Sequence, residues 1–291
     1  MASETNSEHV FRAALVQMRS GRDINANVAA AHVLIREAAA NGAHYVQTPE
    51  NTAFMDHDRD RLAAAAVSEA RHEALLSFRA LAAELGIWLH IGSLAVAAGD
   101  GRAYNRSYLL APDGGIAARY DKIHMFDVNL PNGESYRESA TFAPGNGAVL
   151  AALPWGMLGM TICYDLRFAE QYRALAQAGA QFIAVPSAFT RQTGEAHWHI
   201  LLRARAIETG CYVLAAAQGG RHENGRTTYG HSLIVSPWGD ILAQAGTEPC
   251  VIHADIDSAQ VTAARERIPV LRHARPFQVT SGQESNEEEA A

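Results

Sequence analysis

Hydrophobic and polar positions along the chain alternate between two patterns. Short apolar or alternating runs, closed by Gly, Pro or Asn, predict strands. Longer segments with apolar residues three or four positions apart predict helices, and Gly86, Gly179 and Gly210 stand where three of them should end. The expected strands are 11–17, 43–49, 87–96, 103–111, 116–124, 155–163, 181–189, 211–218, 229–236, 240–246 and 250–256, and the expected helices are 25–40, 61–85, 166–179, 196–210 and 258–267.

Strands and helices follow one another along the whole chain, and no Ser/Gly/Pro-rich linker divides it. Residues 126–147, rich in Pro, Gly and Asn, are expected to form a loop. The pattern predicts a single α/β domain with helices on the outer faces of its sheet or sheets. Several strands are apolar on both faces and should be buried on both sides. Two stacked sheets between helix layers fit this better than one sheet, although periodicity does not separate the two arrangements.

Composition narrows the choice of partners and compartment. The chain has 291 residues, 48% hydrophobic, with a formal net charge of -7, which argues against nucleic acid as a partner. Cys163, Cys211 and Cys250 lie far apart, as expected for reduced thiols in a cytoplasmic protein. Neither a signal segment nor an apolar run of about 18 residues is present, so no membrane association is expected. Residues 1–9 and the acidic residues 280–291 are expected to be disordered tails around a domain at 10–279.

Three chemically useful side chains each follow an expected strand. Glu50 ends "VQTPE", Lys122 lies in "ARYDKIH", and Cys163 ends "GMTIC". Sites in α/β proteins collect at the carboxyl ends of strands, so these groups are expected to meet. A cation and a helix N-terminus lower the pKa of a thiol, and Lys122 and a helix beginning near Leu166 are expected to do so for Cys163. Each residue alone is more often a surface charge or a structural thiol, but together they suit nucleophilic acyl transfer with Glu50 as the base.

Thirteen histidines raise the alternative of a metal site. His197 and His199 lie two residues apart on an expected helix, where their side chains point in nearly opposite directions. Convergence on one ion needs a spacing such as i and i+4. No metal and no cofactor is therefore expected, and His222 and His231 would join a site only by coincidence of folding.

Several motifs resemble the nitrilase superfamily of carbon–nitrogen hydrolases. "TPEN" matches the motif of the catalytic Glu, "YDKIHMFDV" that of the Lys and "GMTICYDLRF" that of the Cys, in the same order along the chain. Longer matches, among them "RESATFAPG", "YGHSLIVSPWG" and "IPVLRHARPF", are most similar to the Nit branch. The resemblance extends from about residue 10 to 277 and implies a four-layer α-β-β-α sandwich that forms homodimers or larger homo-oligomers.

The resemblance also implies roles for individual residues. Glu50 would be the general base, Lys122 would stabilise the tetrahedral intermediate, and Cys163 would form a thioester. Glu138 corresponds to a further carboxylate that positions the lysine or the substrate. The N–H of Tyr164 would complete an oxyanion hole with Lys122.

Two activities of the Nit branch compete. One is hydrolysis of deaminated glutathione to α-ketoglutarate and cysteinylglycine, and the other is ω-amidase action on α-ketoglutaramate. The flanking motifs resemble those of deaminated glutathione amidases more closely than those of ω-amidases. Both substrates are small amides with an α-keto acid carboxylate, for which Arg167 is the candidate cation, while Phe189 and Thr193 match pocket residues of the branch. The insert "GESYRES" departs from the animal enzymes and leaves the leaving group open. A nitrilase, a carbamoylase and a non-catalytic binding protein on the same fold are the remaining alternatives.

Overall fold

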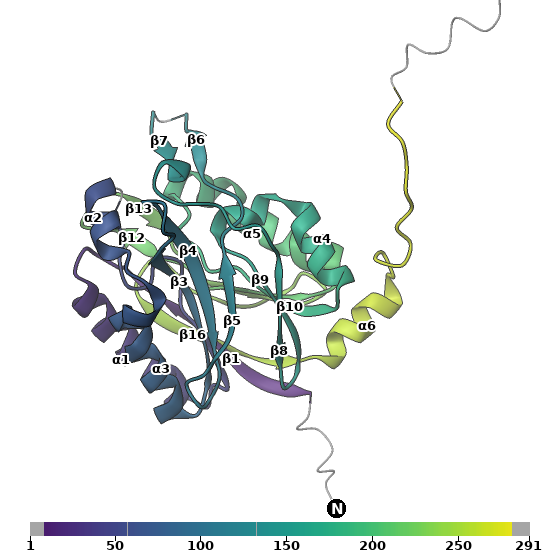
Figure 1. Ribbon diagram of the computed structural model, residues 1–291. Coiled ribbons are helices and arrows are strands. Elements are labelled where there is room, and N and C mark those ends of the chain that lie inside the picture. Colours follow the sequence, from purple (N-terminus) through teal and green to yellow (C-terminus); the bar gives the residue numbers. More distant parts are fainter. Residues whose placement is uncertain (1–8, 57, 132, 281–291) are drawn as a thin grey trace, which may run out of the picture.

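Two six-stranded sheets form the centre of the protein, as seen in a computed structural model that describes residues 9–56, 58–131 and 133–280 (Figure 1). The tails were expected at 1–9 and 280–291, and all of their residues except His9 and Thr280 lie outside the described residues. The first sheet has the order β16-β1-β2-β3-β4-β5 and the second the order β15-β14-β11-β10-β9-β8. Helices cover the outer face of each sheet, which confirms the four-layer α-β-β-α sandwich (Figure 1).

The first sheet is mixed. Its strands are β1 (Val10–Gln17), β2 (Tyr45–Gln47), β3 (Trp88–Ala97), β4 (Ala103–Leu110), β5 (Ile116–Asp121) and β16 (Cys250–Asp257). β1, β2 and β3 run parallel, whereas β4, β5 and β16 pair antiparallel with their neighbours. Helices α1 (Ile24–Ala40) and α3 (Glu73–Leu85) pack on its outer face. α3 ends at Gly86 in the left-handed conformation, as the sequence predicted.

The second sheet repeats this plan. Its strands are β8 (Val149–Leu153), β9 (Gly156–Met160), β10 (Ala180–Ala184), β11 (Tyr212–Ala215), β14 (Leu233–Val235) and β15 (Ile241–Gln244). Helices α4 (Ala169–Gln177) and α5 (Arg191–Thr209) cover it, and α6 (Ala259–Arg267) follows β16. Two short ribbons complete the fold, β6 (Asp127–Asn129) with β7 (Ser135–Arg137) and β12 (Gly219–Arg221) with β13 (Thr227–Tyr229).

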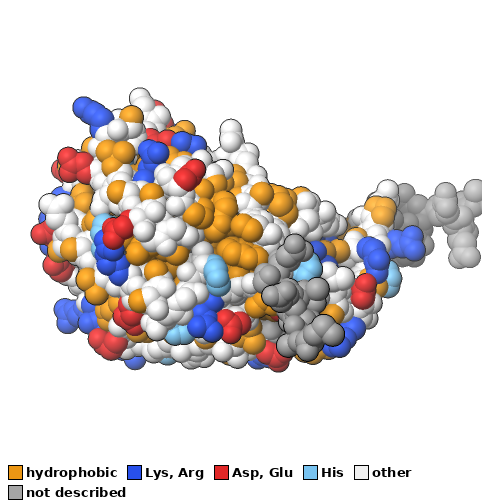
Figure 2. Space-filling view, turned by 90° about the horizontal axis from the view of Figure 1, so that it is seen from below, with side chains coloured by type: hydrophobic (Ala, Val, Ile, Leu, Met, Phe, Trp, Pro, Cys, Tyr) orange, Lys and Arg blue, Asp and Glu red, His pale blue; other side chains and the backbone are white. Residues whose placement is uncertain are grey.

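Apolar side chains fill the space on both sides of each sheet. In β1, Ala13 and Leu15 belong to the core cluster shared with the second sheet, while Ala14 and Val16 belong to the cluster under α1 and α3. Successive residues of a strand point to opposite faces, so one strand serves two cores. Trp155, between β8 and β9, stacks on Phe11 with ring centroids 4.3 Å apart. Seen from below, hydrophobic side chains gather near the middle of the molecule and charged ones toward its rim (Figure 2).

Four expected elements are wrong. The strand expected at 229–236 is divided between the end of β13 at Tyr229 and β14 at Leu233–Val235. The helix expected at 61–85 is divided into α2 (Arg59–Ala65), a 3₁₀ turn (Glu69–Arg71) and α3, because Val67 leaves the helix to pair with Val96 of β3. The loop expected at 126–147 contains the β6–β7 hairpin and a 3₁₀ turn at Glu138–Ala140. The helix expected from Leu166 begins at Ala169, after a 3₁₀ turn at Cys163–Arg167.

Candidate active site

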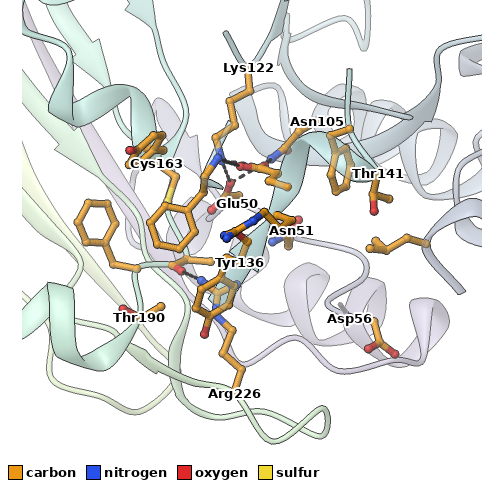
Figure 3. A pocket seen from close by; sticks show the side chains of 18 of the residues that line it. Glu50, Asn51, Asp56, Asn105, Lys122, Tyr136, Thr141, Cys163, Thr190 and Arg226 are labelled. Carbon is orange, nitrogen blue, oxygen red and sulfur yellow. Dashed lines mark hydrogen bonds and ion pairs between the residues drawn. The ribbon is translucent and has the colours of Figure 1, made fainter. Parts of the chain in front are cut away.

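The three groups predicted at strand ends lie together in one cavity. Glu50 follows β2, Lys122 follows β5 and Cys163 follows β9, and their side chains converge at the edge where these strands end (Figure 3). All three are buried, with 4%, 2% and 8% of their surface exposed. The cavity has a volume of about 590 Å³. Every site residue predicted from the sequence lines it, including Glu138, Tyr164, Arg167, Phe189 and Thr193.

The segment carrying Glu50 is fixed by its backbone. Gln218 donates from Nε2 to the Glu50 carbonyl at 3.0 Å, and the Asn51 N–H donates to Ser93 Oγ at 2.8 Å. Asn51 has a φ of 58°, a left-handed conformation that turns the chain just after Glu50. Below this turn lies Gly92 of β3, where a Cβ would stand 2.3 Å from the Thr48 and Pro49 carbonyl oxygens. Only glycine allows the two segments to approach this closely.

Cys163 sits on a strained turn. Its φ of 50° is one of three positive values among non-glycine residues of the described chain. Such a conformation costs about 1–2 kcal/mol for an L-residue and persists only when its surroundings enforce it. The Cys163 N–H donates to the Pro186 carbonyl at 2.9 Å, which anchors the turn to the residues after β10. The turn directs the sulfur toward Glu50 and Lys122 (Figure 3).

Lys122 is held between two carboxylates. Its ammonium group lies 2.9 Å from Glu50 Oε1 and 2.8 and 2.9 Å from the two oxygens of Glu138. Asn105 of β4 donates to Glu50 at 3.0 Å and to Glu138 at 3.3 Å, and the Phe126 N–H donates to Glu138 at 2.6 Å. Burial disfavours the ammonium ion, but the charges of Glu138 and Glu50 outweigh it and raise the pKa of Lys122. Lys122 is therefore a permanent cation beside the sulfur.

A buried carboxylate joins the Lys122 segment to the Cys163 turn. Asp165 Oδ2 accepts from the Tyr120 hydroxyl at 2.6 Å and from the Ile162 N–H at 2.9 Å. Its other oxygen accepts from the His124 N–H at 3.1 Å and lies 2.7 Å from His124 Nδ1. One side chain thus holds residues on both sides of Lys122 against the turn that carries the thiol.

The charged groups around Cys163 and its burial determine the protonation states of Cys163 and Glu50. Burial would raise the pKa of the Glu50 carboxyl, but attraction to Lys122 and hydrogen bonds from Lys122 and Cys163 hold it below its ordinary 4.5. For Cys163, burial and the charge of Glu50 raise the pKa, and Lys122 with the Ala188 backbone only partly offsets them. Lys122 lowers the pKa of this thiol as expected, but the net shift is upward, so the expectation of a lowered pKa is wrong. An ionised carboxylate therefore lies next to a protonated thiol.

The residues predicted to bind substrate lie along one wall. The Arg167 guanidinium stands 5.4 Å from the ring centre of Phe189 and 6.0 Å from that of Tyr164. Phe189 packs on Trp198, and the Thr193 hydroxyl lies 2.8 Å from that of Thr190. Asn105, Tyr136, Asp165 and Arg226 contribute to the site but were not singled out from the sequence. Asn105 and Asp165 stand in stretches that also read as ordinary structural segments, so no local signal marked them.

The four histidines considered in the sequence do not all meet at one point. His197 lies 3.3 Å from Arg167 Nη1, whereas His199 packs against the rings of Tyr229 and His231. His222 is occupied by the Ser20 carbonyl and the Thr228 hydroxyl. Within residues 9–56, 58–131 and 133–280, no group of three or more His, Cys, Asp or Glu has the arrangement of a metal site.

In the same ranges, no helix is both long and apolar enough to cross a bilayer.

The chain is similar to known proteins over most of its length. The sequence pattern described as carbon-nitrogen hydrolase matches residues 12–266. The chain is 42% identical to the deaminated glutathione amidase of Synechocystis over 90% of this chain and 97% of the relative. It is 36% identical to human omega-amidase NIT2 over 91% of this chain and 95% of the relative. The crystal structure of the C. elegans NitFhit protein superposes with a TM-score of 0.85 at 37% identity, covering 92% of this chain and 65% of that one. The chain therefore belongs to the carbon–nitrogen hydrolase family, as its three motifs predicted.

Proposed function

We propose that the protein hydrolyses a small amide through a thioester on Cys163, with deaminated glutathione as the substrate. The observation that carries the proposal is the buried contact of the Cys163 thiol with the Glu50 carboxylate, beside the Lys122 ammonium group. A protonated nucleophile next to an ionised base and a fixed cation is the arrangement that acyl transfer requires.

The chemistry proceeds in two halves. As the sulfur attacks the amide carbonyl, Glu50 takes the thiol proton, and the oxyanion is stabilised by Lys122 and the Tyr164 N–H. Glu50 then gives the proton to the leaving nitrogen, the C–N bond breaks, and a thioester remains. In the second half Glu50 takes a proton from water, hydroxide attacks the thioester, and the acid leaves with restoration of the thiol. Each oxyanion-hole donor contributes about 3 kcal/mol to such a step.

Glu138 acts in this scheme as a positioning residue. Its carboxylate accepts two hydrogen bonds from Lys122, which also binds Glu50, so the ammonium group is not drawn fully onto the base. Arg167, with Phe189 and Thr193, is proposed to bind the α-keto acid carboxylate of the acyl group, since guanidinium binds carboxylate through two hydrogen bonds. The similarity to deaminated glutathione amidases supports this substrate, and the similarity to omega-amidase NIT2 keeps α-ketoglutaramate as the second candidate.

The test is a comparison of kcat/KM for deaminated glutathione, α-ketoglutaramate, a short aliphatic amide and a nitrile. Deaminated glutathione is expected to give the largest value; a larger value for α-ketoglutaramate would overturn the choice of substrate.

Cys163→Ala should abolish turnover and retain the fold, since the two side chains differ only by the sulfur. Cys250→Ala, at a half-buried thiol of β16, is the matched control and should retain activity. Turnover by Cys163→Ala would refute the thioester mechanism, and no turnover of any amide by the wild type would leave a binding role.

A homodimer is also part of the proposal. Ile200 and Ile207 on α5 are 69% and 54% exposed. Trp238, in the segment after β14, is 51% exposed, and the next residue, Gly239, approaches the Ile207 side chain. Apolar side chains of this size on one surface indicate an interaction site, and a second copy of the chain is the proposed occupant. Light scattering should give twice the monomer mass, and Ile200→Glu should reduce it. The three free thiols suit a reducing compartment such as the cytoplasm.

A further inference from the structure

A second arginine, Arg226, enters the cavity on the side away from the Lys122 backbone (Figure 3). It belongs to the turn between β12 and β13, where its carbonyl accepts from the His222 N–H at 2.9 Å. Its Nη2 donates to the Ala188 carbonyl, and its guanidinium carbon lies 5.1 Å from the ring centre of Tyr136. The β6–β7 hairpin and the β12–β13 ribbon thus hold one guanidinium between them.

The guanidinium of Arg226 is not neutralised by a carboxylate of the described chain. Its Nε is buried and has no hydrogen-bond partner among the described residues. The cavity carboxylates are engaged elsewhere: Glu50 and Glu138 by Lys122, Asp56 by Arg22, and Glu134 by the Tyr136 hydroxyl. A half-buried cation that forms no ion pair is costly, and an anion that fills the cavity would reduce that cost.

Arg226 lies close to the reacting groups, and its contacts differ from those of Arg167. Its charge helps to lower the pKa of Glu50, and the single residue Ala188 contacts both Cys163 and Arg226 through its backbone. Arg167 stands against Phe189 and Tyr164, four residues after the nucleophile. The cavity therefore presents two guanidinium groups, neither ion-paired within the described chain, to one bound molecule.

From this arrangement we infer that Arg226 forms a second anion subsite, which binds a carboxylate on the leaving-group side of the scissile amide. The inference rests on the proposed function and deepens it, because such a subsite would favour substrates with two carboxylates over substrates with one. A two-residue leaving group places its terminal carboxylate about 7 Å from the scissile nitrogen. Arg226 lies near that side of the nucleophile, because Ala188 contacts both the Arg226 guanidinium and the Cys163 sulfur. Ammonia as leaving group would leave Arg226 without a function in binding.

The test uses three substrates with wild-type enzyme and three variants. The substrates are deaminated glutathione, its analogue with a C-terminal carboxamide in place of the glycine carboxylate, and α-ketoglutaramate. The variants are Arg226→Gln, Arg226→Lys and Arg221→Gln. Arg221 is an exposed arginine of the same ribbon that does not line the cavity, so its variant controls for loss of one positive charge.

Wild-type enzyme is expected to prefer the carboxylate over the carboxamide by about 10- to 100-fold in kcat/KM, mainly through KM, as for a hydrogen bond between charged groups. In Arg226→Gln this preference should fall to about three-fold or less, Arg226→Lys should retain part of it, and Arg221→Gln should retain all of it. The ratio of kcat/KM for deaminated glutathione to that for α-ketoglutaramate should fall about ten-fold or more in Arg226→Gln.

Several results would overturn the subsite. An equal loss on all three substrates would show that Arg226 only supports the β12–β13 turn, and a preference that survives in Arg226→Gln would place the carboxylate elsewhere. If Arg226→Gln fails to fold, the wild-type comparison of carboxylate and carboxamide decides: equal values refute the subsite. Hydrolysis of α-ketoglutaramate without this preference leaves the amidase proposal standing, whereas no hydrolysis of any amide refutes the proposed function itself.

Discussion

Replacing Glu138 by Gln tests whether Lys122 depends on two carboxylates. The substitution keeps the shape of the side chain but removes its charge and turns one oxygen into an amide nitrogen. Both Glu138 oxygens accept from Lys122, and one also accepts from the Phe126 N–H at 2.6 Å. In the variant, the NH₂ group replaces an oxygen that accepts from Lys122 and also from either Asn105 or the Phe126 N–H, so these donors lose an acceptor.

The magnitude follows from the burial of the pair. The Lys122 side chain is 2% exposed and that of Glu138 13%, so water screens the ion pair weakly. Two unit charges 2.8 Å apart attract by about 6 kcal/mol at an effective dielectric constant of 20. Breaking a buried pair costs about 3–5 kcal/mol, and because Lys122 keeps Glu50 we expect the lower end, about 3 kcal/mol. At about 2 °C per kcal/mol, Tm should fall by about 6 °C.

Activity should fall further than stability accounts for. Without Glu138, Lys122 moves toward Glu50, weakens it as a base and leaves the position of the oxyanion. A displacement of about 1 Å at such a site costs roughly 100-fold, so kcat should fall by about that factor with a smaller change in KM. Differential scanning fluorimetry and steady-state kinetics measure the two effects.

The control is Glu84→Gln, which removes a carboxylate of the exposed pair with Arg36 on α1. It should leave both kcat and Tm close to those of the wild type. If Glu138→Gln keeps the wild-type kcat, Lys122 is positioned without Glu138 and the reasoning is refuted. A lower Tm with unchanged kcat would refute the positioning role alone.

Two further predictions concern the base and the segment that carries it. Gly92→Ala should lower kcat by about 100-fold and destabilise the fold by about 1–3 kcal/mol, because its Cβ displaces the Thr48–Pro49 backbone before Glu50. Gly246→Ala is the control, since open space surrounds Gly246, and it should change neither kcat nor stability. A Gly92→Ala variant with wild-type kcat would contradict the close approach of the two segments. The pH profile of kcat/KM should be flat between about pH 5 and pH 8 and fall only as the pH drops through the lowered pKa of Glu50, because the base form exists above that pKa. Since burial and Glu50 raise the pKa of Cys163, a rate that climbs through about pH 7–9 with thiolate formation would contradict the paired-proton mechanism.

The sequence predicted the position of the chemistry better than its electrostatics. A carboxylate, a cation and a thiol after three separate strands indicated one site, because strand ends meet at one edge. Residue types could not give the balance of charges around the sulfur. A cation beside a thiol ordinarily lowers its pKa, but here burial and the Glu50 carboxylate, 2.9 Å from the same cation, reverse the direction.

The missed elements have local explanations. Residues 62–66 read "LAAAA", which favours helix, so only the pairing of Val67 with Val96 reveals that the helix is interrupted. β6 and β7 have three residues each, mostly polar, and show no apolar alternation. Asn105 lies within β4 as one polar residue among others, and its contact with Glu50 and Glu138 exists only after β4 pairs with β5. Long-range pairing fixes these features, and short sequence windows do not contain it.

The thioester on Cys163 is tested most directly by partition of the acyl enzyme between water and hydroxylamine. Deaminated glutathione and α-ketoglutaramate differ only in the leaving group, so both should form the same α-ketoglutaryl thioester. With hydroxylamine present, the account predicts the same ratio of hydroxamate to free acid from either amide, and no product from Cys163→Ala. A ratio that depends on the leaving group, or free acid alone at every hydroxylamine concentration, would contradict a common intermediate on this sulfur.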